Sequence, residues 1–441
     1  MTKLARWRGS SYARAVPGDE IEIDTVDTVD ADDWNDTDDS NETKRSKFLR
    51  PKSAFMAVLV LVVCSHLLLS VLGTVASSAL DPIRPAGNLA IHQQLEVARH
   101  ELSPHRVVHL WYNWDALHYE RLSDHWFDVR APLAPNVVTA GGGRAWDEFS
   151  WPPLYPVVVG LFHRLTFVKA GAVMVLLGIG LQVTFLWLLR RLSLANGDDD
   201  DTAMAVVLVA IAMPFAFFLG TPLSEPLFVT LAVSSLLALR QQRWLLAGLA
   251  AAAMPWTKIA GVLMVVPLAI SGIGEVRRSS DRSWRTVSRA FAPALMCGLS
   301  FVLYLGFARW LTGTPWAPFE TQRVGWGNST GNPILNLIRD IDRWQYVAVA
   351  GLLVLTAALG VRRWISWTEA SFCLVMLLAA SSVATIVPAA PRYAAVAFPL
   401  ATGLARWARA RSVLPYLVGT GAIVQGAVFI VWSTYWIGEM Y

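Results

Sequence analysis

Residues 54–76 read AFMAVLVLVVCSHLLLSVLGTVA, an apolar stretch that contains no Asp, Glu, Lys or Arg. A run of this kind is long enough to cross the hydrocarbon core of a bilayer, which takes about 20 residues of helix. In lipid, every backbone amide and carbonyl must be paired within the segment, so a spanning run forms a helix. Similar runs recur along the chain, and the sequence therefore predicts an all-α polytopic membrane protein.

The composition excludes an ordinary soluble protein. Hydrophobic residues make up 54% of the chain, charged residues only 16%, and the mean hydropathy is +0.43. A soluble domain carries about 25% charged residues. The cysteines, Cys64, Cys297 and Cys373, all lie inside apolar runs, so no disulfide framework is expected.

The apolar runs lie at 54–76, 152–168, 170–190, 203–219, 226–240, 244–256, 257–272, 290–311, 344–361, 369–387, 394–410 and 412–433. The run 152–168 begins with several prolines and contains His163 and Arg164, so we interpret it as a re-entrant or interfacial helix. The other runs then give a bundle of about eleven transmembrane helices.

Basic clusters fix the orientation, because Lys and Arg in short loops stay on the cytoplasmic side of a membrane. They lie at Lys44–Lys52, Arg190-Arg191, Arg240/Arg243, Arg277–Arg289, Arg362-Arg363 and Arg406–Arg411. With a re-entrant 152–168, every cluster falls inside, the N-terminus is cytoplasmic and the C-terminus lies outside. We expect a multi-pass protein of the plasma membrane with an extracytoplasmic active face.

Three parts follow from this topology. Residues 1–53 are predicted to be a disordered, acidic cytoplasmic tail with a basic collar against the first span. Residues 54–272 form a transmembrane module with a large outer loop at 77–151. Residues 273–441 form a C-terminal transmembrane module with an outer loop at 312–343.

An acid and a histidine stand in the first outer loop, where Trp111–Tyr119 reads WYNWDALHY. His118 follows Asp115 by three residues, so the two share a helix face, and His118 can orient the acid or contact a phosphate. A carboxylate beside the membrane, among aromatic rings, suits a general base. A solvated acid at a helix N-terminus would show the same residues, and this alternative stays open.

Breaks in apolar hairpins bring further charges to the predicted outer face. The residues concerned are Glu225 between two prolines, Lys258 after Pro255-Trp256, and Arg392-Tyr393. An acid between two spans is costly unless it is paired or functional. Lys and Arg are natural phosphate ligands, and the alternative for each is that it extends to the lipid headgroups.

The sequence contains no soluble nucleotide site. A Walker loop, a Rossmann fingerprint and a Cys/His metal pattern are all missing from it. No nucleic-acid partner is therefore expected, and a lipid is favoured as the carrier of an activated substrate. Asp147 and Glu148 are a second acid, metal ligands or solvated loop residues, so a divalent metal stays open as a cofactor.

Three motifs occur in order, namely Trp114-Asp-Ala-Leu-His-Tyr119, Phe149-Ser-Trp-Pro-Pro-Leu-Tyr-Pro156 and Leu223-Ser-Glu-Pro-Leu-Phe228. With Lys258 ahead of Gly261, they resemble the PIG-V-type mannosyltransferases of the GT-C superfamily, which are integral membrane glycosyltransferases that use polyprenyl-phosphate sugars. The family usually shows Arg where Lys258 stands. The motifs fall within residues 54–272, and the rest of the chain resembles the family in hydropathy alone.

The resemblance implies a GT-C-like bundle with 54–272 as its catalytic module. It implies inverting transfer of mannose from polyprenyl phosphate mannose to a lipid or glycan acceptor on the outer face of the bilayer. Asp115 would be the catalytic base. The implied donor-binding residues are Trp114, His118, Tyr119, Tyr155, Glu225, Lys258, Arg392 and Tyr393.

Other functions fit the same residues. A GT-C transferase of arabinose or glucose would carry similar motifs, since these motifs do not specify the sugar. A transporter or flippase for a lipid-linked sugar would use the same acids and cations along its substrate pathway, although no internal repeat is evident. A non-catalytic membrane partner that presents its acidic tail would leave the outer-face residues unexplained.

Overall fold

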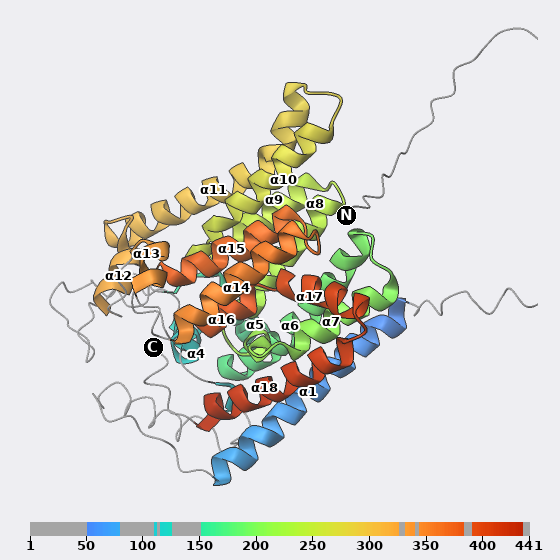
Figure 1. Ribbon diagram of the computed structural model, residues 1–441. Helices are drawn as coiled ribbons and strands as arrows, with labels where there is room; N and C mark the ends of the chain where they lie inside the picture. Colours follow the sequence, from blue (N-terminus) through green and yellow to red (C-terminus); the bar gives the residue numbers. More distant parts are fainter. Residues whose placement is uncertain are drawn as a thin grey trace, which may run out of the picture. The chain divides into compact units, whose positions relative to one another are not determined.

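The computed structural model describes residues 51–79, 110–112, 115–125, 151–325, 331–339, 344–382 and 390–434. Within these ranges every regular element is a helix (Figure 1). The predicted acidic tail and most of the predicted outer loop at 77–151 lie outside them.

The helices follow the chain in the order α1 (Pro51–Ala79), α4 (Asp115–His125), α5 (Leu154–Thr166), α6 (Ala170–Ala195), α7 (Asp200–Ala212), η3 (Ala216–Gly220), α8 (Glu225–Arg240), α9 (Trp244–Ala253), η4 (Ile259–Met264), α10 (Val265–Arg278), α11 (Trp284–Thr312), α12 (Ala317–Gly325), α13 (Pro333–Arg339), α14 (Trp344–Val361), α15 (Trp367–Ser381), α16 (Ala390–Val396), α17 (Pro399–Ala410) and α18 (Leu414–Thr434). Helix α10 runs across the predicted module boundary at 272/273.

Five of the described helical segments are long and apolar enough to cross a membrane, namely Lys52–Ala76, Ala170–Ala195, Ile259–Arg278, Trp284–Thr312 and Leu414–Ser433. The predicted class of an all-helical membrane protein is therefore supported. The predicted count of about eleven crossings is not confirmed, because other apolar runs form shorter helices such as α9, α14 and α15.

Two predicted runs are interrupted where the chain reaches a proline. The run 203–219 forms α7 and then, beyond Met213-Pro214, the short 3₁₀ helix η3. The run 394–410 includes the end of α16 and all of α17, which begins at Pro399. Proline has no amide hydrogen for the helical ladder and its ring clashes with the preceding turn, so it disfavours a continuous helix at these two places.

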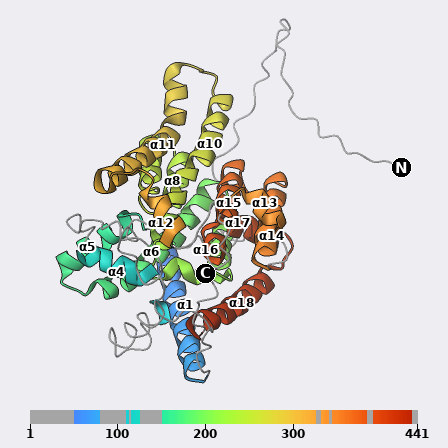
Figure 2. The same cartoon turned by 90° about the vertical axis from the view of Figure 1, so that its left-hand side faces the viewer.

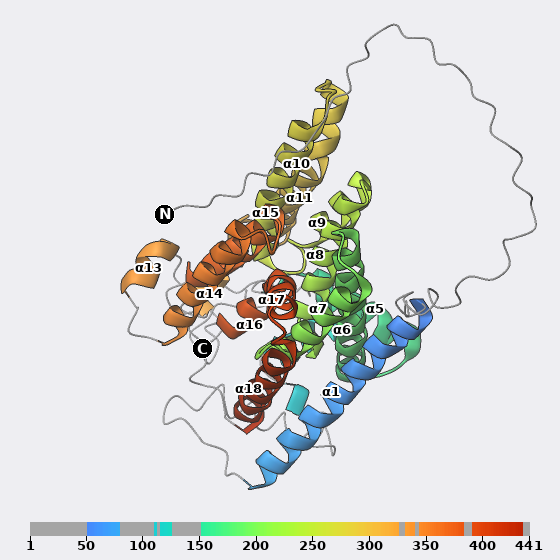
Figure 3. The same ribbon diagram turned by 45° about the vertical axis from the view of Figure 1, so that its right-hand side comes forward.

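The long helices expose apolar faces. On α1, Leu67 and Leu68 are 61% and 60% exposed, and on α11 Leu299 is 62% exposed. Apolar surface of this extent is unfavourable in water and matches the hydrocarbon of a bilayer. Figures 1 and 3 show α1 beside α18 at one edge, and α10 beside α11 in a hairpin that projects beyond its neighbours.

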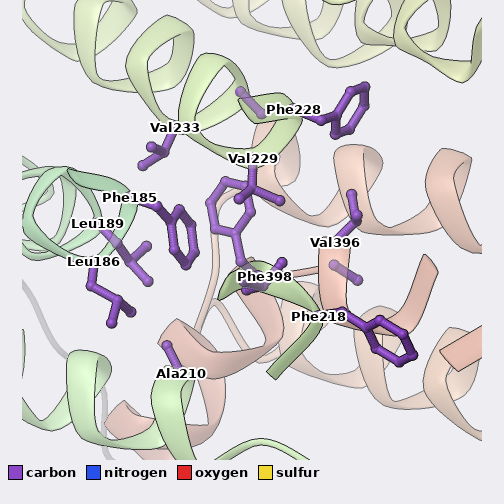
Figure 4. Packing of buried hydrophobic residues seen from close by; sticks show 14 of the residues in the cluster. Phe185, Leu186, Leu189, Ala210, Phe218, Phe228, Val229, Val233, Val396 and Phe398 are labelled. Carbon is purple, nitrogen blue, oxygen red and sulfur yellow. The ribbon is translucent and has the colours of Figure 1, made fainter. Parts of the chain in front are cut away.

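Large buried side chains hold the central helices together. Phe185 of α6 packs edge-on against Phe398, with ring centroids 5.4 Å apart, and Phe398 also contacts Phe372 of α15. Val229 and Phe228 of α8 lie around the same cluster (Figure 4). This core ties the chain before α16 to the chain after it, and so fixes where α16 lies.

The helices carry different chemistry at their two ends. Helix α8 begins at Glu225 and ends at Arg240, and its 16 residues span about 24 Å at 1.5 Å per residue. Lys258 likewise precedes η4 and α10, whose last turn holds Arg277 and Arg278. One end therefore presents Glu225 and Lys258, and the other presents arginines.

Candidate functional site

Four charged side chains from distant parts of the sequence meet at one end of the helices. Arg392 Nη1 donates to Asp115 Oδ2 at 2.7 Å, and Arg392 Nε donates to Glu225 Oε1 at 2.6 Å. Lys258 Nζ donates to the same Glu225 oxygen at 2.6 Å. We refer to Asp115, Glu225, Lys258 and Arg392 as the charged network.

The charged network is shielded from solvent and balanced in charge. The side chain of Glu225 is 0% exposed, that of Arg392 is 9% exposed, and that of Asp115 is 14% exposed. Two carboxylates face two cations, which lowers the cost of removing these charges from water. Lys258 and Arg392 both contact carboxylates of the charged network. They therefore do not extend separately to lipid headgroups, which was the alternative for each.

Helix starts place the two carboxylates. Asp115 is the first residue of α4 and Glu225 is the first residue of α8, which follows with Pro226 in its first turn. The positive end of a helix dipole favours an acid at such a position. Figure 2 shows α4 beside α5 and α6. This packing places Asp115, the first residue of α4, toward α8.

Lys258 reaches the network from an extended residue between two helices. Its φ and ψ are −148° and 138°, and η4 begins at the next residue. The amide of Lys258 donates to the Met254 carbonyl at 2.9 Å, and the amide of Leu154 donates to the Trp256 carbonyl at 2.8 Å. This break therefore positions both Lys258 and the start of α5.

Gly261 allows that turn to close. A Cβ atom at Gly261 would lie 2.4 Å from the carbonyl carbon and oxygen of Met254, which are backbone atoms and cannot rotate away. We expect Gly261→Ala to lower the free energy of unfolding by about 1–3 kcal/mol, as overpacking does. Denaturant titration in detergent micelles measures this, and Gly306→Ala is the control because nothing lies within 4 Å of its added methyl group. Equal stability of the two variants would show that the turn tolerates a side chain.

Three tyrosines surround the charged network. Tyr119 donates its hydroxyl proton to Ser224 Oγ at 2.9 Å and meets Tyr155 edge-on, with ring centroids 5.0 Å apart. Lys258 Nζ lies 5.4 Å from the ring centroid of Tyr393. Burial raises the pKa of Tyr119 well above its ordinary value, so this phenol keeps its proton. The tyrosines thus provide hydroxyl groups and apolar faces, without additional charge.

Two buried polar atoms beside the network have no partner among the described residues. They are the hydroxyl oxygen of Tyr155 and Glu225 Oε2. Buried polar groups in proteins are nearly always hydrogen-bonded, because leaving one unpaired is costly. The hydroxyl can donate and the carboxylate oxygen can accept, so this part of the site suits a ligand with hydroxyl groups.

His118 lies near the charged network but is not part of it. Its ring stacks on Trp151, with centroids 4.0 Å apart and an interplanar angle of 15°. Burial lowers the pKa of His118, the Asp115 charge partly opposes this, and Arg121 lowers it further. The structure therefore places His118 near Asp115 with its ring held by an aromatic neighbour, where burial favours the neutral form.

The lowered pKa of His118 predicts an acid-sensitive protein. A histidine whose folded pKa lies below its ordinary value of 6.5 contributes stability above that pH and loses it as the pH falls through the folded pKa. We expect the unfolding temperature to fall below pH 6.5, and His118→Phe, which keeps a ring against Trp151, to weaken that fall. Thermal unfolding scans between pH 5 and 8 test this. If the unfolding temperature of the wild type and of His118→Phe depends on pH in the same way, the acid sensitivity arises from other groups.

No sequence pattern indicated the residues that hold α4 in place. Glu120 accepts from the Tyr112 hydroxyl through Oε2 and from the Gly171 amide at the start of α6 through Oε1, at 3.0 Å. Glu120 thereby joins α4 to α6 and helps to hold Asp115 in place. Ser224 was visible beside Glu225 in the sequence, but only the structure shows that it bonds Tyr119.

Other predicted residues lie outside the described residues. These are Trp114, Asp147 and Glu148. Within the described ranges, no group of three or more His, Cys, Asp or Glu side chains is placed to hold a metal ion. The geometry of the predicted site therefore rests on Asp115, Tyr119, Tyr155, Glu225, Lys258, Arg392 and Tyr393, with His118 stacked nearby.

Comparisons of this chain with models of protein families, with curated proteins and with solved structures found no match.

Proposed function

We propose that this protein is a membrane glycosyltransferase of the GT-C type that moves mannose from a polyprenyl phosphate mannose donor to a lipid or glycan acceptor. The observation that carries the proposal is the convergence of Asp115, Glu225, Lys258 and Arg392 beside two buried oxygens that have no hydrogen-bond partner among the described residues. A sugar donor on a lipid phosphate needs a base, cations for the phosphate, and partners for its hydroxyl groups. This site supplies all three kinds of group.

Asp115 is the proposed base. Its Oδ2 is held by Arg392, while Oδ1 accepts no hydrogen bond from any side chain in the described ranges. In the reaction, Asp115 takes the proton of an acceptor hydroxyl as that oxygen bonds to the anomeric carbon of the sugar. The bond from the anomeric carbon to the phosphate oxygen breaks, and its electron pair leaves with the phosphate. The configuration at the anomeric carbon is inverted.

Arg392 and Lys258 are the proposed ligands of the departing phosphate. A guanidinium group has five N–H donors, and Arg392 uses Nε and Nη1 for the two carboxylates. Lys258 has three N–H donors and directs one to Glu225. The remaining donors can bind the phosphate, whose negative charge grows as the bond breaks.

Glu225 and Tyr155 are the proposed ligands of the sugar. Glu225 Oε2 can accept from a sugar hydroxyl, and the Tyr155 hydroxyl can donate to or accept from another. Glu225 Oε1 is already held by both cations. Glu225 would thus connect sugar recognition to the groups that bind the phosphate.

Helix α5 is the proposed entry side for the lipid tail. Leu161, Leu165 and Phe167 are 52%, 68% and 92% exposed on α5 and at its end, whereas Tyr155 at its start is buried. An apolar exposed end with a buried polar start suits an interfacial helix. We propose that α5 is re-entrant or interfacial within about eleven crossings, and that the site opens to the outer face of the plasma membrane.

Transfer of radiolabelled mannose tests the proposal. The purified chain in bilayers is given polyprenyl phosphate mannose and a membrane extract that contains acceptors, with glucose and arabinose donors in parallel. Mannose in the lipid or glycan fraction supports the proposal, and transfer of another sugar instead would change the donor. If the folded protein transfers none of these sugars but moves the labelled lipid across sealed vesicles, the transferase proposal is wrong and a flippase replaces it.

A further inference from the structure

A second polar cavity lies at the arginine end of the helices, away from the charged network. Its volume is about 1330 Å³, and its walls include the ends of α8, α10 and α17 and the start of α15. Helix α8 separates the two sites along its length, because Glu225 begins it and Arg240 ends it. Nothing in the proposed transfer reaction uses this cavity.

Arginines dominate the charge of the cavity. Six of them line it, namely Arg240, Arg277, Arg278, Arg363, Arg406 and Arg409. Three carboxylates line it as well, those of Asp198, Glu275 and Glu369. The lining thus carries an excess of positive charge.

The carboxylates of the lining already have partners. Asp198 binds the Arg406 guanidinium, with Nη2 to Oδ2 at 2.7 Å. Glu369 accepts from the Ser366 amide at 2.8 Å and from Asn196 Nδ2 at 3.0 Å. Glu275 lies 3.6 Å from Arg278. Asp198 and Glu275 are therefore paired with Arg406 and Arg278, and Glu369, whose partners here are neutral donors, offsets at most one of the remaining positive charges.

Three arginines of the lining lack an acidic partner in the part of the chain that the structure describes. No carboxylate in the described ranges forms an ion pair with Arg240, Arg277 or Arg363. The preference of Lys and Arg for the cytoplasmic side explains why arginines occur at this end. It does not explain why arginines from three separate helix ends line one cavity.

Arg363 is one of four non-glycine residues with a positive φ in the described ranges, the others being Phe167, Gln242 and Ser412. Its φ is 59°, in the left-handed region that favours glycine at the end of a helix. The backbone at this position would be less strained with glycine, and the arginine side chain is exposed beside the cavity. A ligand that uses the guanidinium group gives a reason for an arginine there.

We propose that this cavity binds a phosphate ester through Arg240, Arg277 and Arg363. The planar donors of guanidinium groups match the oxygens of a phosphate in pairs. Tryptophans and aliphatic residues, among them Trp244, Trp364 and Leu239, form the other part of the wall. The ligand therefore combines a phosphate with an apolar or aromatic part, and it comes either from the headgroup region of a membrane lipid or from a soluble organic phosphate.

Binding to the full-length chain in nanodiscs tests the proposal and distinguishes the two sources. In the soluble arm, radiolabelled phenyl phosphate, an aromatic phosphate ester, is titrated against protein in neutral phosphatidylcholine discs. In the lipid arm, phosphatidic acid replaces part of the phosphatidylcholine. Saturable binding or a saturable rise in unfolding temperature is expected in at least one arm, since a ligand that binds only the folded state stabilises it.

Matched variants locate the site. Replacing Arg240, Arg277 and Arg363 together by Gln should weaken binding more than about tenfold, because charge-assisted hydrogen bonds are lost. Replacing Arg282, Arg285 and Arg289 together by Gln removes the same charge from the same end but leaves the lining intact, and should change affinity less than about twofold. If both triple variants lose the same amount of affinity, the probe is attracted by the overall positive charge at this end of the helices, and the proposal is overturned.

A single variant separates binding from folding. Arg363→Gly removes one guanidinium and relieves the left-handed backbone, so it should unfold at no lower temperature than the wild type. It should nevertheless bind the phosphate probe more weakly. Unchanged affinity in this variant, or no saturable binding of either probe by the wild type, overturns the proposal. Because the readout is binding, the outcome does not depend on sugar transfer.

Discussion

Asp115→Asn is expected to lower the rate of sugar transfer by about 10²–10⁴-fold, the range that a general base contributes. The amide cannot take up the proton of an acceptor hydroxyl. Its carbonyl oxygen can still accept from Arg392, which also stays paired with Glu225. The variant should therefore fold and bind the donor while losing the chemical step. The initial rate at saturating donor, measured in bilayers, tests this.

Asp124→Asn is the matched control for that experiment. Asp124 lies on the same helix as Asp115, is exposed, and has His163 as a neighbour at 3.7 Å. The same chemical change outside the charged network should leave transfer close to that of the wild type. Near-normal transfer by a folded Asp115→Asn protein would remove Asp115 from the role of base, even if the wild type transfers mannose.

Glu225→Gln is expected to lower the free energy of unfolding by about 3–5 kcal/mol, the cost of breaking a buried ion pair from one side. Glu225 Oε1 accepts from both Lys258 and Arg392, and its side chain is 0% exposed. After the substitution, Asp115 alone faces the two cations. Reversible unfolding in mixed micelles, followed by tryptophan fluorescence, measures the loss.

A double variant tests whether the loss comes from unbalanced charge. Adding Lys258→Met to Glu225→Gln leaves Arg392 paired with Asp115 and removes the second cation, so much of the stability should return. Glu275→Gln, which removes a partly exposed acid 3.6 Å from Arg278, should cost less than about 1 kcal/mol. If the single and double variants are equally unstable, the effect of Glu225 does not arise from charge balance.

The sequence by itself determined where most helices form. The predicted run 226–240 matches α8 within one residue, and the predicted run 290–311 lies inside α11. The physical reason is that apolar segments in lipid must pair their own backbone groups, which leaves the helix as their structure. The same reasoning singled out Glu225, because an ionised side chain between two spans is too costly to be incidental.

Only the tertiary structure decided how those charges are used. Asp115 and Arg392 lie 277 positions apart in the chain, and no sequence pattern indicates that one guanidinium joins Asp115 to Glu225. The sequence predicted Lys258 and Arg392 as phosphate ligands, which stays a prediction, and the structure shows that both bind one Glu225 oxygen. Such contacts depend on how α4, α8 and α16 pack. That packing arises from many small apolar contacts, such as those around Phe398, which local sequence does not specify.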